Sequence, residues 1–400
     1  MEARAIIQEA MSLQDQMCEI RRELHRHPEL GFDLTYTKAR VIEKLKELGY
    51  EPIEMGRSGV VATIGKPGGS CILVRADMDA LPINEEADVD YKSLTPGQMH
   101  GCGHDMHTAM LLGAAALLKQ HEDELEGMVK LEFQPAEEIF RGSQDMIDAG
   151  ILESPHVDAA FMMHVAAGFP MPSGLLMIPT QGGISMASCE QYHITVKGKG
   201  GHGALPNMAI DPITAAAHIH LALQEINSRE LDPMGYGIFT TCRFEAGQTS
   251  NVIPDTAEMW GTIRTIDPEG AVTEQIHKRM TEIAVSVGSA MRCEVEVEFY
   301  DFCPCMVIND EVTKDTLKYM TELLGQGVIP TPTKPAGGSE DFAFISHKVP
   351  TTSMFISAGG TQEGYMYSQH NPKVRFNDSI LYVGAAAYAY NAYRWLSEHK

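Results

Sequence analysis

One stretch of nine residues carries the densest set of side chains that can do chemistry in this sequence. Residues 99–107 read Met-His-Gly-Cys-Gly-His-Asp-Met-His and hold three histidines, a thiol and a carboxylate. The two glycines let the backbone turn tightly, which is typical of a metal-binding loop. A thiolate and an imidazole one residue apart suit zinc or a similar borderline metal, so we expect Cys102 and His104 to be ligands. His100 and His107 are better explained as a surface residue and a helix-cap residue.

Two adjacent carboxylates, Glu137 and Glu138, form a second candidate. They follow the apolar segment 129–133, which we expect to be a strand. Such a pair often only faces water, and neighbouring side chains diverge, so the two carboxylates cannot easily do the same job. If they belong to a metal site, Glu138 is the ligand. Glu137 then takes the proton from a water whose pKa the metal has lowered.

Other metal-type side chains also stand at the ends of expected strands. His164 ends one apolar segment, and Asp77 and Asp79 follow another at residues 71–76. In an open α/β sheet, ligands bind beyond the carboxyl ends of the strands, so these residues should meet at one edge. A late histidine, His370, could close the site, although its position in the sequence leaves this open.

The elements that must position these residues alternate between short apolar strands and amphipathic helices. This order predicts an α/β domain with a mostly parallel sheet covered by helices. We expect strands at 60–64, 71–76, 129–133 and 157–163, and helices at 35–48 and 107–121.

The pattern changes near residue 186 and returns to the first type after residue 300. The middle part predicts a complete βαββαβ, ferredoxin-like unit inserted into the larger domain. We therefore expect catalytic segments at 1–185 and 301–400 and an inserted domain at 186–300. The inserted elements are strands at 190–196, 237–244, 257–266 and 292–299, one helix opened by Asp211 and one opened by Asp267. In the segment after residue 300 we expect a helix at 311–324, a strand at 352–356 and a helix from 380.

The bulk composition restricts the partners. With 31 basic and 54 acidic residues the formal charge is −23, which repels nucleic acid and anionic lipid surfaces. Residues 1–20 contain no continuous apolar stretch, and nowhere do 18 uncharged apolar residues occur in a row. Eight scattered cysteines suit a reducing compartment. We expect a cytoplasmic protein that binds neither nucleic acid nor membrane.

Six short motifs occur in order along the whole chain. They are Arg-Ala-Asp-Met-Asp-Ala-Leu-Pro at 75–82, the loop that holds Cys102 and His104, Pro-Ala-Glu-Glu at 135–138, Gly-Gly-His at 200–202, Asn-Val-Ile-Pro at 251–254 and Gly-Ser-Glu-Asp-Phe at 338–342. Together they resemble the metal-dependent aminoacylase and carboxypeptidase family. The resemblance is strongest to its branch of hippurate hydrolases, auxin-conjugate amidohydrolases and N-acetyl-diaminopimelate deacetylases.

The resemblance implies a centre with two divalent metal ions. In it Cys102 bridges the ions and Asp79 orients a ligand as part of the catalytic set. Much of the family has His-x-Asp and a bridging Asp at the positions that here carry Asp77-Met78-Asp79 and Cys102. The thiolate favours zinc, and the branch is also associated with manganese, nickel or cobalt. The remaining implied ligands are His104, Glu138, His164 and His370.

The resemblance also implies residues that bind substrate. An arginine on an expected strand usually faces solvent, but Arg264 is implied to hold the substrate carboxylate, with Asn251 and the backbone of Gly338 and Ser339 as further contacts. His202 would stabilise the oxyanion of the tetrahedral intermediate, often from the partner subunit. The inserted domain would act as a lid and as the contact surface of a homodimer.

The predicted reaction is hydrolysis of the amide bond of a small N-acyl amino acid, with Glu137 as the base. We expect an apolar acyl pocket, for which the 24 methionines would provide adaptable walls. A di- or carboxypeptidase with the same centre is the nearest alternative. A catalytically silent binding protein is disfavoured by the intact Glu137, and a structural zinc protein would show a closed shell without a second metal.

Overall fold

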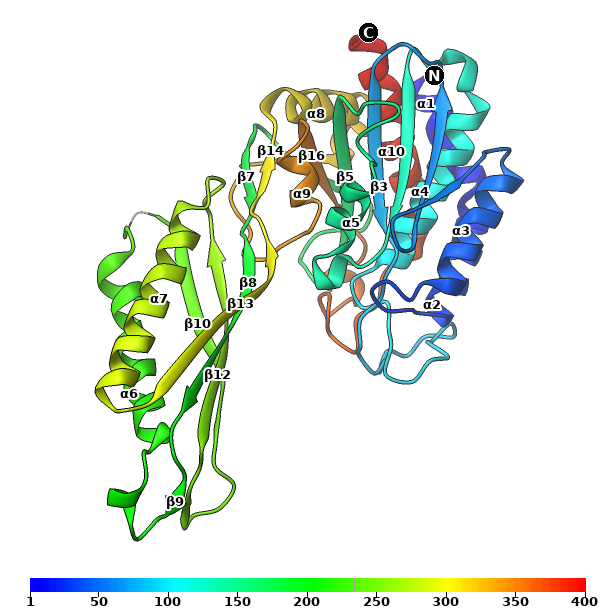
Figure 1. The fold of residues 1–400 in the computed structure, drawn as a ribbon. Helices are drawn as coiled ribbons and strands as arrows, with labels where there is room; N and C mark the ends of the chain where they lie inside the picture. Colours follow the sequence, from blue (N-terminus) through cyan, green and yellow to red (C-terminus); the bar gives the residue numbers. More distant parts are fainter. Residues whose placement is uncertain (234) are drawn as a thin grey trace. The chain divides into compact units, whose positions relative to one another are not determined.

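The computed structural model describes all residues except residue 234, and the chain forms two compact units (Figure 1). The first unit comprises residues 1–183, 307–333 and 341–400, so it contains both ends of the chain. The second unit comprises residues 184–306 and 334–340. Strands β7 (Gly183–Met186) and β14 (Met306–Ile308) span two of the places where the chain passes from one unit to the other.

The first unit is built on an eight-stranded sheet. Its four central strands run parallel, as the alternation of strands and helices predicts, while the two strands at one edge are antiparallel to their neighbours. In order across the sheet, the strands are β1 (Ile53–Met55), β2 (Gly59–Gly65), β4 (Met128–Gln134), β3 (Cys71–Asp77), β5 (Ala159–Ala166), β16 (Thr351–Ser357), β6 (Leu176–Pro179) and β15 (Val328–Thr331).

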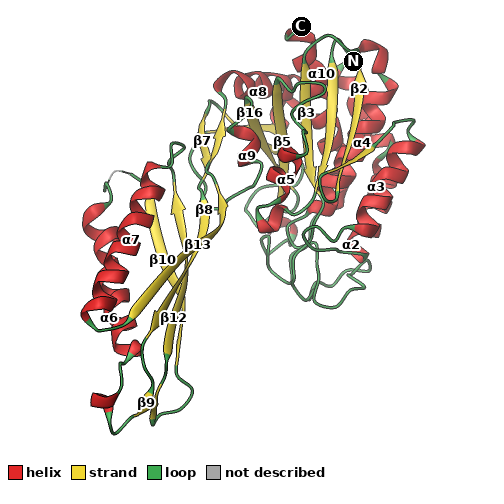
Figure 2. Ribbon diagram, in the orientation of Figure 1, coloured by secondary structure: helices red, strands yellow, loops and turns green. Residues whose placement is uncertain are grey.

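Helices cover both faces of this sheet (Figure 2). Two long helices, α4 (His104–Gln120) and α10 (Leu381–Glu398), pack against each other and against β3, where Ile72, Val74 and Ala76 face the same apolar core. Two short helices, α5 (Gly142–Asp148) and α9 (Ala343–Ser346), contact each other and the strands β4 and β16. The remaining helices are α1 (Ala3–Ser12), α2 (Gln14–Arg26), α3 (Thr35–Glu47) and α8 (Asp310–Leu324).

Most expected elements are confirmed to within a few residues, and the differences have physical reasons. The first two helices were not predicted. In α2 the charged residues outnumber the apolar ones that face the core, and α1 buries only Ile6 and Ala10. Helix α4 begins at His104 rather than at His107, because Gly103 takes the left-handed conformation (φ +93°) that starts the helix. Strand β5 extends to Ala166, so His164 lies inside the strand instead of ending it.

The second unit follows the order strand, helix, strand, strand, helix, strand. The elements are β8 (Cys189–Lys197), α6 (Pro212–Glu225), β10 (Gly237–Ala246), β12 (Thr256–Thr265), α7 (Ala271–Ala290) and β13 (Glu294–Cys303), with the short pair β9 (Gly201–His202) and β11 (Val252–Ile253) beside them. The antiparallel sheet has the strand order β10, β12, β8, β13.

The two helix starts predicted in the second unit differ in outcome. Asp211 caps α6 as expected, because its carboxylate accepts a hydrogen bond from the main-chain N–H of Ile213. Asp267 does not open α7 directly. Its carboxylate accepts from Glu269 and Val272, and the helix begins only after Gly270 in the left-handed conformation (φ +78°).

None of the helices in the described part of the chain is both long enough and apolar enough to cross a membrane.

Candidate metal centre

The side chains of Cys102, His104 and His164 meet near the carboxyl ends of the central strands. Cys102 lies in the loop before α4, His104 is the first residue of that helix, and His164 comes from β5. The Sγ atom of Cys102 lies 3.4 Å from Nε2 of His164. This close approach depends on Gly103, because a Cβ atom there would lie 2.4 Å from the side chain of Val165.

Both histidines are held so that the same nitrogen faces the cluster. Nδ1 of His104 donates to the main-chain oxygen of Asp79 at 2.9 Å, and Nδ1 of His164 donates to that of Val165 at 2.6 Å. A carbonyl can only accept, so Nδ1 carries the proton in each ring and Nε2 keeps its lone pair. Hydrogen bonds of this kind orient metal-ligating histidines.

Nε2 of His104 is buried and has no hydrogen-bond partner within the described part of the chain. It lies 3.6 Å from Asp77, 3.8 Å from Glu138 and 4.0 Å from Glu137, measured to the nearest carboxylate oxygens. These distances are too long for hydrogen bonds. They suit ligand atoms that share one ion, since two atoms about 2.1 Å from a tetrahedral metal lie about 3.4 Å apart.

A further group of possible ligands consists of Cys102, Glu138 and His370. Nε2 of His370 lies 3.6 Å from Oε2 of Glu138, and Oε1 of Glu138 is buried with no hydrogen-bond partner among the described residues. His370 has a left-handed backbone (φ +64°), and its N–H donates to Gly101 at 2.9 Å, which brings the C-terminal segment to the cysteine loop. Such strain in a non-glycine residue often marks a functional site.

Burial shapes the charges of the cluster. Burial raises the pKa of the Cys102 thiol well above its ordinary value, and the Glu138 carboxylate adds to this shift. Burial also raises the pKa of Glu138 to about 7 and lowers the pKa of His164 to about 3. A divalent cation would reverse the first two shifts, because it binds the thiolate and the carboxylate. The thiol, imidazole and carboxylate donors and the unpartnered Nε2 and Oε1 atoms therefore fit a pair of divalent ions.

Asp79 holds the two glutamates in place. Its carboxylate oxygens accept hydrogen bonds from the main-chain N–H groups of Glu137 at 3.0 Å and Glu138 at 3.2 Å. The two glutamates form a 3₁₀ turn (Glu137–Ile139) that follows Ala136 in the left-handed conformation (φ +55°). This turn brings both side chains toward His104, although neighbouring side chains usually diverge.

His100 and His107 are both buried, so their interpretation as a surface residue and a cap residue was wrong. Nδ1 of His107 lies 2.5 Å from Asp77, and its Nε2 accepts from the main-chain N–H of Val165 at 2.9 Å. Both ring nitrogens are therefore used, and His107 positions Asp77 rather than a metal. No local pattern predicts this arrangement, because burial of the loop results from tertiary packing.

The residues expected to bind substrate all lie in the second unit and are described there alone. His202 is exposed on β9, where its Nδ1 accepts from the N–H of Ala204 at 3.1 Å. Arg264 is half-buried on β12, and its guanidinium donates to the hydroxyl of Thr262 and to the main-chain oxygen of Ile263. Asn251 and Gly338 are exposed, and Ser339 is half-buried.

The fold and the site define an α/β protein with a candidate metal centre at the carboxyl ends of parallel strands. The chain belongs to the peptidase family M20/M25/M40, whose profile matches residues 73–394.

Relatives in this family cover nearly the whole chain. It is 37% identical over 392 residues to IAA-amino acid hydrolase ILR1-like 5 of Arabidopsis thaliana, covering 96% of this chain and 87% of the relative. It is 37% identical over 384 residues to thermostable carboxypeptidase 1 of Saccharolobus solfataricus, covering 94% of both. It is 35% identical over 376 residues to N-acetylcysteine deacetylase of Bacillus subtilis, covering 93% of this chain and 95% of the relative.

The fold is also that of a solved member of the family. The crystal structure of a dinuclear metal-binding M20 peptidase from Bacillus subtilis superposes with a TM-score of 0.79 at 31% identity, covering 96% of this chain and 99% of that chain.

Proposed function

We propose that the protein is a two-metal amidohydrolase that cleaves the amide bond of an N-acyl amino acid and releases a carboxylic acid and a free amino acid. The observation that carries the proposal is that Cys102 belongs to two groups of possible ligands, one with His104 and His164 and one with Glu138 and His370. The names of the plant hydrolase and the bacterial deacetylase support N-acyl amino acids as the substrate class.

The proposed cofactors are two divalent ions, and Cys102 would be a ligand common to the two groups that could hold them. His104 and His164 offer Nε2 atoms, and Glu138 and His370 offer the remaining ligand atoms. The thiolate favours zinc, while manganese, nickel and cobalt suit the imidazole and carboxylate donors. The relation to a dinuclear metal-binding peptidase supports two ions rather than one.

The ions would supply a polarised carbonyl and an activated water. Glu137 is the proposed base, because its carboxylate is buried and lies 4.0 Å from Nε2 of His104. It accepts a proton from water and passes it to the nitrogen of the leaving amino acid. Asp79 keeps this carboxylate in position through the main-chain N–H of Glu137.

For the second unit we propose an inserted ferredoxin-like domain that acts as a lid and as the contact surface of a homodimer, with domain boundaries at 1–185, 186–300 and 301–400. The βαββαβ order and the strand order β10, β12, β8, β13 support the fold assignment. Arg264 would hold the substrate carboxylate, with Asn251, Gly338 and Ser339 beside it. His202 would donate to the oxyanion. A cytoplasmic location is part of the same proposal.

A panel of substrates combined with metal analysis tests this function. The metal-loaded protein should hydrolyse N-acetyl or N-benzoyl amino acids and should contain two exchangeable ions per chain. Glu137→Gln should keep both ions and lose roughly 100-fold to 10,000-fold in kcat, whereas Glu138→Gln should lose metal. Full activity in Glu137→Gln would refute the base, and one tightly held zinc without hydrolysis would favour a structural site.

A carboxypeptidase is the second candidate, because a relative of equal identity carries that name. Dipeptides and N-acyl amino acids should therefore be assayed side by side. If kcat/KM is higher for the dipeptides than for the N-acyl amino acids throughout the panel, the protein is a peptidase and the proposed deacylase activity is wrong.

A further inference from the structure

An apolar pocket of about 320 Å³ lies in the first unit. Its walls include Phe169 and Met171 from the loop after β5, Met177 from β6, Phe355 from β16 and the side chain of Gln369. Half of the surface of Phe169 is exposed (50%). Phe169 therefore contributes a partly exposed aromatic wall, and an apolar pocket of this size is the usual kind of site for a small ligand.

The register of the sheet connects this pocket to the candidate metal centre. Phe355 is paired with His164 on β5 and with Met177 on β6. Paired residues on neighbouring strands face the same side of a sheet, so these three side chains form one row. The ring centroids of His164 and Phe355 are 6.1 Å apart. The apolar row therefore begins beside the imidazole of a proposed ligand and leads away from it.

The chemistry of the walls excludes a charged group. No charged side chain lines the pocket among the described residues. The amide of Gln369 is engaged by the backbone, since Nε2 donates to Val165 at 2.7 Å and Oε1 accepts from the N–H of Ala167 at 3.4 Å. A carboxylate or an ammonium group placed here would lose its hydration without gaining a partner, which is costly.

We infer that this pocket holds the acyl group of the substrate and selects an aromatic or medium-chain aliphatic acyl group over acetyl. The inference rests on the proposed function, because only a hydrolase of N-acyl amino acids has an acyl half to place. The charged α-carboxylate belongs to the other half of such a substrate. An apolar cavity of about 150 Å³ is enough for benzene, so the volume admits a benzoyl group or a chain of several methylenes. Met171 and Met177 are flexible walls that can adapt to either shape.

Kinetics with one amino acid and several acyl groups test this inference. The amino acid is the one that the metal-loaded wild type releases fastest, and the acyl groups are acetyl, hexanoyl and benzoyl. The wild type should prefer hexanoyl or benzoyl to acetyl by about tenfold or more in kcat/KM, since single methylenes in apolar pockets already change rates about tenfold. Met177→Trp, which fills the pocket, should reduce this ratio at least tenfold. Met11→Trp is the matched control, because Met11 is an exposed methionine of α1.

A second variant and a binding measurement separate the possible failures. Phe169→Ala changes a half-exposed side chain, so it should fold, and it should also lower the ratio. Saturation-transfer NMR with benzamide and acetamide reports on the pocket even without hydrolysis. Benzamide should bind the wild type and the Met11→Trp control, and Met177→Trp should abolish its binding. Absence of hydrolysis together with this binding pattern would refute the proposed function but not the role of the pocket as a site for an aromatic group. An acetyl preference, or benzamide binding that neither pocket variant changes, would overturn the inference.

Discussion

Nδ1 of His104 donates a hydrogen bond to the main-chain oxygen of Asp79 at 2.9 Å. The carboxylate of the same aspartate accepts from the main-chain N–H groups of Glu137 and Glu138. One residue therefore orients a proposed ligand through its backbone and the two glutamates through its side chain. These two contributions can be separated, because a substitution changes the carboxylate and leaves the carbonyl in place.

Asp79→Ala should weaken metal binding and lower kcat. It removes the acceptor for two main-chain N–H groups, so the strained turn after Ala136 loses its support. Loss of such supporting hydrogen bonds typically costs about 10-fold to 100-fold in metal affinity or activity. Calorimetric metal titration and steady-state kinetics measure both effects. Asp90→Ala is the control, since Asp90 is exposed. Unchanged metal affinity and kcat in Asp79→Ala would show that the turn holds without this carboxylate.

Arg21→Met should destabilise the first unit by about 3 to 5 kcal/mol, because it removes one of the two charged partners of a buried carboxylate. Nε of Arg21 lies 2.8 Å from Asp105, and the two side chains are 1% and 0% exposed. Burial alone would raise the pKa of Asp105, but the charges of Arg21 and His25 hold it well below its ordinary value. Chemical denaturation gives the free energy of unfolding.

A matched arginine on the same helix gives the control for this prediction. Arg22 also pairs with an aspartate, Asp378, at 2.8 Å, but its side chain is 40% exposed. Exposed pairs contribute little, so Arg22→Met should cost less than about 1 kcal/mol. Equal losses for the two variants would mean that burial does not decide the effect.

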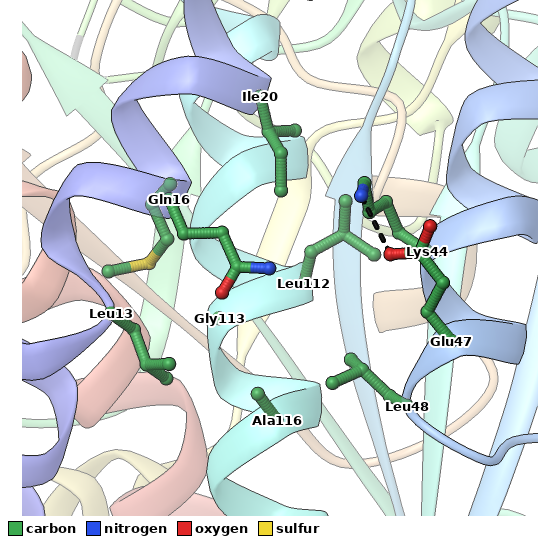
Figure 3. Close-up of a pocket in the computed structure, with 10 residues that line it drawn as sticks. Leu13, Gln16, Ile20, Lys44, Glu47, Leu48, Leu112, Gly113 and Ala116 are labelled. Atoms are coloured by element: carbon green, nitrogen blue, oxygen red, sulfur yellow. Dashed lines mark hydrogen bonds and ion pairs between the residues drawn. The ribbon is translucent and has the colours of Figure 1, made fainter.

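Ala116→Leu should stabilise the protein by filling a cavity of about 240 Å³ between α2, α3 and α4 (Figure 3). Figure 3 shows Ala116 at the edge of this cavity, with Leu13 and Leu48 also on its walls. Filling a cavity without strain typically gives about 0.5 to 2 kcal/mol. Ala115→Leu is the control, because Ala115 is fully buried in the packed core, and overpacking there should cost about 1 to 3 kcal/mol. The midpoints of thermal unfolding should therefore move in opposite directions.

Local signals explain which parts of this structure could be predicted from the sequence. The spacing of apolar residues predicted most strands and helices, and Asp211 predicted the start of α6, because these signals act within a few residues. Cys102 and His104 were singled out as candidate ligands from residue type and spacing, and the structure brings their side chains together. The burial of His107 could not be predicted in this way, since its contact with Asp77 joins segments that are distant in the sequence. The row that joins His164 to Phe355 depends on strand register, which no local pattern specifies.

Glu132 on β4 should make the stability of the first unit fall as the pH rises. Both of its carboxylate oxygens are buried without a hydrogen-bond partner in the described part of the chain. Burial raises the pKa of Glu132 to about 7, although the charges of Arg75 and Lys130 oppose the shift. The folded state therefore favours the protonated acid. This contribution is complete below the ordinary pKa of a glutamate and is lost as the pH rises through about 7.

Glu132→Gln removes this titration, so the variant should lose less stability than the wild type between pH 6 and pH 8. The expected difference is about 1 kcal/mol, because the stability falls by about 1.4 kcal/mol per pH unit between the ordinary pKa and the raised one, and the interval covers only the last part of that range. Both pH values lie above the isoelectric point near 5.0, where the net charge keeps the protein soluble. Urea unfolding of both proteins at the same metal content measures this difference in stability loss. The contributions of the other titrating groups cancel in the comparison. Glu51→Gln, at an exposed position, should behave as the wild type does. Parallel pH profiles for the wild type and Glu132→Gln would mean that Glu132 is ionised in the folded protein at pH 6, and that a partner for its charge exists.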